Sequence, residues 1–149
     1  MKLSTKSRYA LEGLLNIAIH SPNEAVRIKQ IAECTKISVA YLEQIFFLLK
    51  KSNLLTTVRG SKGGYTLAKP SQEITVGMII RSIETHIVPV ACVGSLSECN
   101  SRVRANCVSR QIWIQINDTI NRIVDHLTLQ DLADRYKAQN LTAKKGDSQ

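Results

Sequence analysis

The stretch "VRIKQIAECTKISVAYLEQIFFLLKKSNLL" (residues 26–55) decides the fold, because it holds two amphipathic helical patterns separated by only a few residues. The first pattern covers residues 28–35, and the second runs from the N-cap Ser38 to residue 51. Lys50 and Lys51 suit the negative end of the second helix dipole. Two helices joined by so short a connection predict a helix-turn-helix. The expected core positions of the pair are Ile28, Ile31, Ala32, Leu42, Ile45, Phe46 and Leu49.

A glycine-rich hairpin is predicted directly after the helix pair. Residues 54–58 and 65–68 are rich in Thr, Val and Tyr, and they flank the tip "RGSKGG" (residues 59–64). The tip carries Arg59 and Lys62, and its glycines let the backbone approach a phosphate closely. It is either a basic wing that contacts DNA or a plain tight turn. The spacing of a nucleotide-binding P-loop is absent.

Further helices follow from the same periodicity. Residues 5–20 and 75–85 predict helices, the second capped by Thr75, whereas residues 86–107 show no periodicity. A long helix over 108–127 carries apolar residues at alternating steps of three and four, which is typical of a seam for another helix. The members of this seam, expected to mediate dimerisation, are Trp113, Ile116, Ile120, Ile123 and Leu127.

These segments predict a mainly α fold with a small β-hairpin wing, in which a winged helix-turn-helix DNA-binding domain is joined to a long dimerisation helix. The expected domains are a DNA-binding domain over 1–85 and a cysteine-bearing loop over 86–107. A dimerisation helix and a short closing helix are expected over 108–138, followed by a disordered tail over 139–149.

The charge distribution favours a polyanion as the partner of the first half. Within the net charge of +8, residues 1–69 hold eleven Lys and Arg against four Glu, whereas residues 70–149 hold nine against eight Asp and Glu. A solvated basic surface would give the same count, but the helix pair, the basic tip and the charge asymmetry agree on double-stranded DNA. Glu43 would accept a hydrogen bond from a cytosine amino group, or pair with a lysine as an ordinary surface carboxylate. The residues expected at the DNA are Ser38, Ala40, Tyr41, Glu43, Gln44, Arg59, Gly60, Lys62 and Gly63.

Three cysteines fall in the aperiodic stretch, namely Cys92, Cys99 and Cys107. Their spacing matches no C-x-x-C zinc pattern. An iron–sulfur cluster tolerates wider loops, so the spacing leaves open cluster ligation, redox-active thiols and inert side chains. Cys34, on an apolar helix, is expected to be a small core residue.

The sequence does not indicate an enzyme. His20, His86 and His126 are scattered, and no Ser/His/Asp, paired-carboxylate or phosphate-loop constellation is present. No stretch approaches the roughly 20 apolar residues of a membrane span. The first residues carry charges within their apolar run, so we expect no export signal and a reducing cytoplasm around the thiols.

Several stretches carry a family resemblance: "MKLSTKSRYALEGLL" (1–15), "YLEQIF" (41–46), "VRGSKGGY" (58–65), "ITVGMIIRSIE" (74–84) and "VSRQIWIQINDTINRIVDHLTLQDLA" (108–133). Together with the three cysteines they resemble the IscR-type regulators, the iron–sulfur branch of the Rrf-type winged-helix family. The resemblance implies a homodimeric repressor that binds palindromic operators, with its long helices paired across the two-fold axis. It also implies a 2Fe–2S cluster on the three cysteines that tunes DNA affinity at cluster-assembly or cysteine-supply genes. A cofactor-free thiol switch or cysteine-metabolism regulator of the same fold is the alternative.

Two positions depart from the pattern of this family. Some relatives supply a fourth cluster ligand from a His three residues after the last Cys, and Arg110 stands there. A guanidinium has no lone pair to offer a metal. Nitric-oxide-sensing relatives use an acidic residue early in the first helix of the partner subunit, where this chain has Arg8. Glu12, one turn further on, is either a candidate fourth ligand or a surface partner of Arg8.

Overall fold

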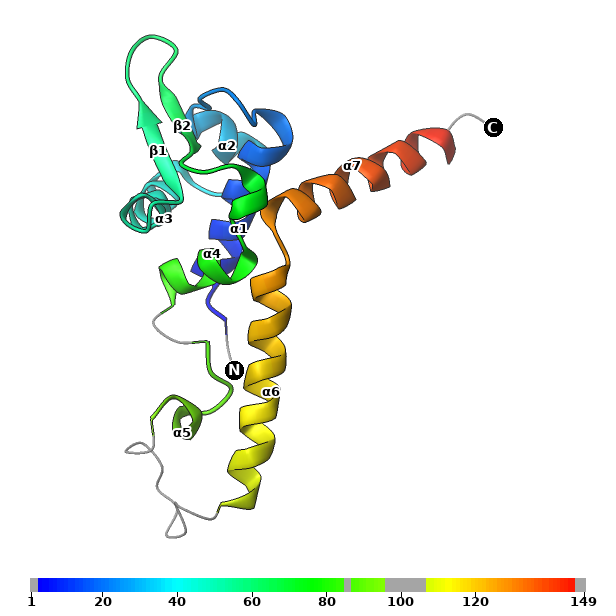
Figure 1. Ribbon diagram of the computed structural model, residues 1–149. Helices are drawn as coiled ribbons and strands as arrows, with labels where there is room; N and C mark the ends of the chain where they lie inside the picture. Colours follow the sequence, from blue (N-terminus) through cyan, green and yellow to red (C-terminus); the bar gives the residue numbers. More distant parts are fainter. Residues whose placement is uncertain (1–2, 85–86, 96–106, 147–149) are drawn as a thin grey trace.

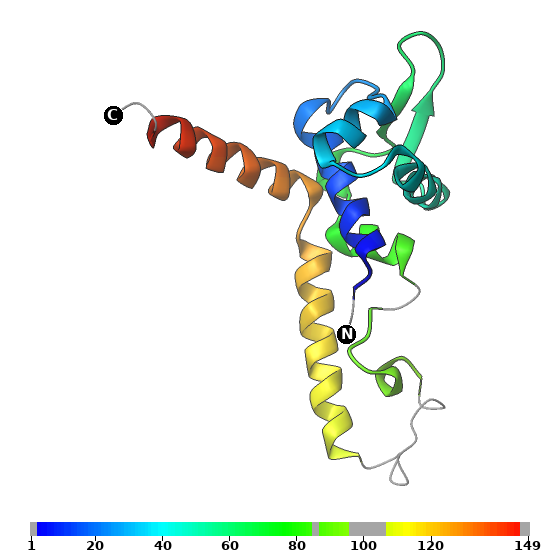
Figure 2. The same ribbon diagram turned by 180° about the vertical axis from the view of Figure 1, so that it is seen from behind.

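The computed structural model describes residues 3–84, 87–95 and 107–146, and of residues 142–146 only the backbone. A helical unit carries a two-stranded hairpin, and two long helices extend from this unit in different directions (Figure 1; Figure 2). In chain order the elements are α1 (Thr5–His20), α2 (Ile28–Thr35), α3 (Val39–Lys51), β1 (Leu55–Val58), β2 (Gly64–Leu67), the 3-10 turn η1 (Ser71–Glu73), α4 (Val76–Ile83), α5 (Ala91–Gly94), α6 (Val108–His126) and α7 (Leu129–Gly146).

The helix-turn-helix prediction is confirmed. Only Lys36, Ile37 and Ser38 separate α2 from α3. Lys36 adopts a left-handed backbone conformation with φ of 60°, which ends α2 sharply. The Ser38 side chain accepts a hydrogen bond from the Tyr41 backbone N–H, as predicted for an N-cap. The turn therefore reverses the chain within a few residues and sets α3 at the outer edge of the unit (Figure 1).

One core holds α1, α2, α3 and α4 together. Gly13 of α1 lies against the ring of Phe46, and a Cβ on Gly13 would come within 2.8 Å of that ring. The missing side chain thus lets α1 and α3 approach closely. Among the predicted core residues, Ile28 and Ala32 are half-buried at the edge of the core. The fully buried ones are Ile31, Leu42, Ile45, Phe46 and Leu49.

The hairpin prediction is also confirmed. β1 and β2 pair antiparallel, with Leu55 opposite Leu67 at the base. A short bridge ties β2 to the segment before α2: the Val26 N–H donates to the Tyr65 carbonyl at 2.8 Å, and the Tyr65 N–H donates to the Val26 carbonyl at 2.9 Å. This bridge attaches the hairpin to the helical unit along its second strand.

The second half of the chain docks on α4. The Thr75 side chain caps α4 as predicted, accepting a hydrogen bond from the Met78 N–H at 3.1 Å. The Val76 N–H donates to the carbonyl of Leu127, which lies in the turn between α6 and α7, at 2.9 Å. α6 and α7 diverge from this junction, and α5 lies beside the opposite end of α6 (Figure 1).

Three features differ from the sequence predictions. α7 continues to Gly146, so the closing helix is longer than predicted and occupies most of the stretch expected to be disordered. Cys34 is exposed, not a core residue, because the buried side of α2 runs through Ile31 and Thr35, one turn apart. α5 adds a helical turn to the aperiodic stretch. No helix in the described residues is long and apolar enough to cross a membrane.

Two adjacent phenylalanines of α3 test the core assignment. Phe46 is fully buried, whereas Phe47 is 67% exposed. Phe46→Ala should lower the free energy of unfolding by about 3–5 kcal/mol, because it leaves a cavity between α1 and α3. Phe47→Ala should change that free energy by less than about 0.5 kcal/mol. Urea denaturation followed by circular dichroism measures both, and equal losses would contradict the assignment.

Candidate nucleic-acid interface and thiol site

The outer face of α3 presents most of the predicted DNA contacts to solvent. Exposed on it are Ser38, Ala40, Glu43 and Gln44. Tyr41 is half-buried, because its ring packs edge-on against the ring of Tyr9 in α1, with 5.7 Å between the centroids. Tyr41 therefore anchors the start of α3 on α1, and its neighbours on the helix turn outward.

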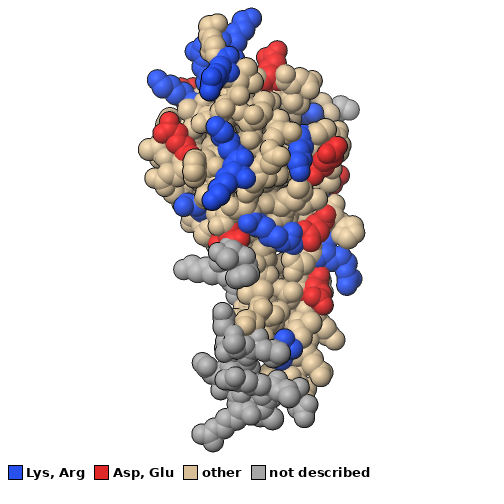
Figure 3. Space-filling view, turned by 60° about the vertical axis from the view of Figure 1, so that its left-hand side comes forward, with Lys and Arg blue, Asp and Glu red and all other residues tan. Residues whose placement is uncertain are grey.

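The hairpin tip adds positive charge beside this face. Arg59 and Lys62 are exposed, and Lys and Arg side chains surround the hairpin and the surface below it in Figure 3. Gly60 has a φ of 108°, which residues with a side chain rarely adopt. A Cβ on Gly63 would collide with the carbonyl of Val58. The geometry of the turn thus accounts for both glycines, whereas the two cations have no part in forming it.

Contacts with the body fix the hairpin relative to α3. The Arg27 Nη2 donates to the Ser61 carbonyl at the hairpin tip at 2.7 Å. The rings of Phe46 in α3 and Tyr65 in β2 meet edge to face, with centroids 4.9 Å apart. These contacts therefore set the spacing between α3 and the hairpin. In the sequence Arg27 was recognised only as one of the basic residues of the first half. Neighbouring residues give no indication that its side chain reaches the hairpin tip, 34 residues further along the chain.

Two of the three predicted cysteine ligands lie in the described residues. Cys92 belongs to α5 and Cys107 is the N-cap of α6, and both are half-buried. Cys99 lies outside the described residues, and within them no three His, Cys, Asp or Glu side chains gather as a metal site. A hydrogen bond between the Cys107 Sγ and the Ser109 Oγ, 3.1 Å apart, and the backbone N–H of Arg110 lower the pKa of the Cys107 thiol.

These surroundings suit a soft-metal ligand. The thiolate is the form that binds iron, and the lowered pKa of Cys107 favours it. The Arg110 Nε donates to the Cys92 carbonyl at 3.1 Å and so holds α5 against the first turn of α6. The two described thiols therefore fit an iron–sulfur cluster by donor chemistry. Arg110 is no ligand, but it joins the segments that carry both thiols, a role that sequence reasoning missed.

Glu12 forms a surface ion pair with Arg8, one of the two roles expected from the sequence. Its Oε1 lies 3.6 Å from the Nε of Arg8, one turn earlier on the exposed side of α1. An exposed pair of this kind contributes at most about 1 kcal/mol to stability. The Glu12 carboxylate can therefore leave Arg8 at little cost in free energy. A role for Glu12 as the fourth cluster ligand would act across a subunit interface and stays a prediction.

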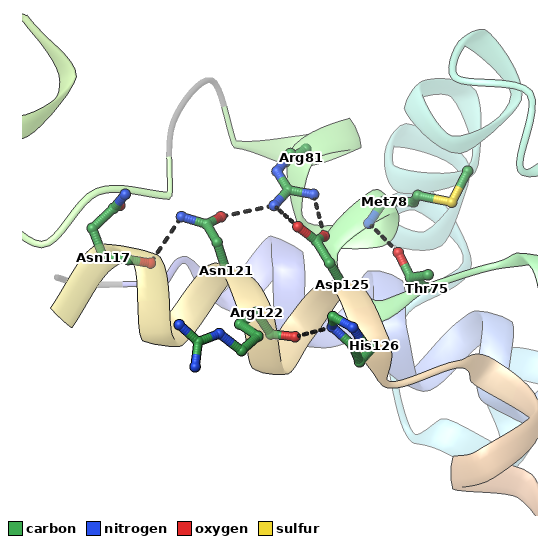
Figure 4. A network of polar contacts seen from close by, with 8 residues as sticks. All are labelled: Thr75, Met78, Arg81, Asn117, Asn121, Arg122, Asp125 and His126. Atoms are coloured by element: carbon green, nitrogen blue, oxygen red, sulfur yellow. Dashed lines mark hydrogen bonds and ion pairs between the residues drawn. The ribbon is translucent and has the colours of Figure 1, made fainter. Parts of the chain in front are cut away.

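A polar clamp, formed by Arg81, Asn121 and Asp125, joins α4 to α6 (Figure 4). The Arg81 guanidinium donates to both Asp125 carboxylate oxygens, at 2.6 and 2.9 Å, and to the Asn121 Oδ1 at 2.7 Å. These hydrogen bonds lower the pKa of Asp125 and raise that of Arg81. A Cβ on Gly77 would collide with the Asp125 carboxylate. No motif predicted this clamp, because its partners lie 40 and 44 residues apart in the chain.

α6 carries one broad apolar face that includes the predicted seam, and α4 covers only part of it. Ile120 and Leu127 pack against Val76 and Ile80, so part of the predicted seam is covered by α4 of the same chain. A second set of apolar side chains on α6 is exposed, and we call it the α6 stripe. Its members are Val108, Ile112, Trp113, Ile116 and Ile123. A run of exposed apolar side chains on one helix is typical of a protein–protein interface.

Comparison with known proteins agrees with this architecture. The chain matches the Rrf2 family, described as an iron-dependent transcriptional regulator, over residues 3–135. It is 36% identical over 141 residues to the HTH-type transcriptional regulator IscR of Pectobacterium atrosepticum, covering 95% of this chain and 84% of that protein.

Two solved structures are similar over most of their length. CymR, the global cysteine regulator of B. subtilis, has a TM-score of 0.76 and 34% identity, covering 91% of this chain and 98% of that one. T. potens IscR has a TM-score of 0.73 and 33% identity, covering 93% and 91%. The winged-helix fold and the resemblance to this family are confirmed. The chain belongs to the Rrf2 family of winged helix-turn-helix transcriptional regulators, which bind DNA and are not enzymes.

Proposed function

We propose that the protein is a homodimeric cytoplasmic repressor whose operator affinity is tuned by a 2Fe–2S cluster on Cys92, Cys99 and Cys107. One observation carries the proposal: Arg110 joins the segments of Cys92 and Cys107 at the start of α6, the same helix that Arg81 clamps to the DNA-binding unit. A change at the thiols therefore acts on a helix that is attached to the reading surface. The genes under control would serve cluster assembly or cysteine supply.

The DNA contacts divide into base reading and backbone positioning. Glu43 and Gln44 face outward from α3 and would read base edges in the major groove, with Glu43 accepting from a cytosine amino group. Arg59 and Lys62 would hold the flanking backbone or enter the minor groove. The other expected contacts are Ser38, Ala40, Tyr41, Gly60 and Gly63.

The α6 stripe supports a two-fold dimer. Two copies of α6 packed along this face would bury the exposed apolar side chains of both chains. The two α3 helices would then reach half-sites about 34–36 Å apart on a palindromic operator. Ile120 and Leu127 are also proposed for this contact, and they are half-buried because they pack against the cluster that includes Val76 and Ile80 of α4.

A bound cluster would supply a bridge between the thiols that is lost or altered when iron, oxygen or thiol status changes. The residues of this chain do the rest. The Ser109 side chain and the backbone N–H of Arg110 lower the pKa of Cys107 and so favour its thiolate form. Arg110 keeps Cys92 close to the same helix end. Glu12 of the partner subunit is the proposed fourth ligand.

A cofactor-free thiol switch is the second candidate. Two observations favour it: the likeness to CymR, named as a cysteine regulator, and the lowered pKa of Cys107, which would also make it a reactive thiol. Iron and sulfide analysis of protein purified without oxygen separates the two. Iron-free protein whose DNA affinity changes with reversible oxidation would support the switch and contradict the cluster.

Removal of single thiols tests the cluster. Cys92→Ala and Cys107→Ala should each abolish the visible absorbance of protein purified without oxygen, because each removes a thiolate ligand. Cys34→Ala is the matched control and should keep the absorbance, since Cys34 is exposed on α2. Wild-type protein that is colourless and iron-free, yet binds its operator, would leave only a plain DNA-binding repressor.

Arg59→Ala tests the wing. It should weaken operator binding by about 1 kcal/mol or more per half-site, because it removes a cation from the DNA surface. Arg135→Ala removes another exposed arginine, from α7, and should leave affinity nearly unchanged. Fluorescence anisotropy over a range of salt concentrations measures both. Equal effects of the two variants would count against the wing as a DNA contact.

Ile123→Asp tests the dimer. A carboxylate in the α6 stripe would have to be buried unpaired, so the variant should be mainly monomeric and bind palindromic DNA at least about tenfold more weakly. Ile123 is 61% exposed, so the change leaves the core intact. Leu141→Asp, at a position 67% exposed on α7, is the control. Sedimentation velocity gives the masses, and an unchanged dimer would refute this interface.

Asp125→Asn tests the clamp. It should lower the free energy of unfolding at pH 7 by about 0.5–1 kcal/mol, as expected for a partly exposed ion pair between two elements. The pKa of Asp125 is lowered in the folded state, so its contribution is complete above the unfolded pKa and is lost as the pH falls through the folded one. The difference from wild type should therefore hold from pH 7 to 5 and shrink below about pH 4. Glu12→Gln, in the pair within α1, should have a smaller effect in the same urea titrations.

A further inference from the structure

Phe47 is an aromatic side chain of α3 that does not pack into the core. It is 67% exposed, although the ring of Phe46 beside it is completely buried. α3 is described along its whole length, and Phe47 is the large apolar residue of this helix that faces solvent. An exposed phenylalanine on a helix face is unfavourable in water and gains free energy when another apolar group covers it.

The position of Phe47 continues the row of proposed base contacts. Ala40, Glu43, Gln44 and Phe47 are spaced i, i+3, i+4 and i+7, and all four are exposed. This is the spacing at which a helix lying in the major groove presents side chains to successive base edges. The ring therefore lies on the face that carries Glu43, one turn closer to the C-terminus of the helix.

The surroundings of Phe47 favour a polyanion over an apolar protein partner. Lys50 and Lys51 follow it on α3 and are exposed, and the Lys50 Nζ reaches Thr57 in β1 at 3.4 Å. β1 of the hairpin that carries Arg59 and Lys62 at its tip contacts the same helix (Figure 1). An apolar partner would have to desolvate these cations, whereas a DNA duplex pairs them with phosphates and presents its base edges to the ring.

We propose that Phe47 determines sequence specificity by contacting the C5-methyl group of a thymine in each half-site. The thymine methyl is the apolar group that base pairs offer in the major groove, and a phenylalanine is suited to contact it. One helical turn is about 5.4 Å, which lies between one and two base-pair rises. The thymine is therefore one or two base pairs from the pair read by Glu43. This inference rests on the proposed DNA interface.

Removal of a single methyl group tests the contact. The probe is a duplex enriched from a random-sequence pool by the full-length wild-type protein. Each thymine is then replaced in both half-sites by deoxyuridine, which lacks only the methyl. At one position the replacement should weaken wild-type binding about fourfold per half-site, the effect of one buried methyl-sized group. Phe47→Ala should bind both duplexes with equal affinity, so that the penalty disappears.

Matched variants separate this contact from other effects. Phe47→Leu keeps an apolar side chain and should retain part of the deoxyuridine penalty. Leu141→Ala removes an equally exposed apolar side chain from α7 and should retain all of it. A Phe47→Ala protein that keeps the wild-type penalty at every thymine would overturn the inference and leave the DNA interface intact. A Phe47→Ala protein whose mass in solution differs from that of wild type would also overturn the inference, because Phe47 would then contact another protein chain. A wild-type protein with no preference for the enriched duplex over a scrambled one would overturn the interface and the inference together.

Discussion

Burial of one face of α3 is the constraint on which the rest of the structure depends. Leu42, Ile45, Phe46 and Leu49 are fully buried, and each side chain of this size contributes about 1.5–3 kcal/mol when it leaves water. With 3.6 residues per turn, a rotation of the helix by even one residue would expose part of this face and bury Glu43 or Gln44. The core therefore fixes the direction of the outward face, which is the face proposed to meet a duplex.

α4 connects this core to α6, whereas Leu129 and Ala133 at the start of α7 belong to the core itself. At its C-terminal end the Glu84 carboxylate accepts hydrogen bonds from the Ser4 N–H at 2.9 Å and the Ser7 hydroxyl at 2.6 Å. The side chains of Ser4 and Ser7, together with the Ser4 N–H, lower the pKa of Glu84. In its last turn Arg81 forms hydrogen bonds to Asp125 of α6. α1 and α6 are thus both attached to α4 by charge-assisted hydrogen bonds. A displacement of α6 either carries α4 with it or breaks the clamp.

Local sequence patterns predicted the helices and strands well. Long-range contacts could not be predicted, because they depend on how distant segments pack against each other. Ser38 and Thr75 were recognised as caps, because capping depends on residues within one turn. Helical spacing predicted α6 and a row of apolar residues along it. It does not say which neighbour covers each one, and Ile120 proved to pack within its own chain while Ile123 is exposed.

The same limit applies to the candidate sites. The basic tip was predictable from its residues, but the bond from Arg27 that braces the tip was not, since it spans 34 residues. Arg110 could be excluded as a ligand from its chemistry alone, yet its bond to the Cys92 carbonyl depends on how α5 folds back on α6. Cys34 was assigned to the core because α2 is rich in apolar residues. Its position around the helix places it on the side that faces solvent.

The distance between the thiols and the reading surface limits how a signal can pass between them. α6 has 19 residues, a length of about 28 Å, with Cys107 at one end and the junction to α4 at the other. A change at the thiols cannot touch α3 directly, so it must alter the orientation of α6 or its pairing with a second copy. In the proposed dimer two half-sites must fit at once, so a small change in that pairing would alter affinity without altering either reading face. Coupling of this kind is reciprocal: if cluster occupancy strengthens operator binding, operator binding must strengthen cluster retention by the same factor.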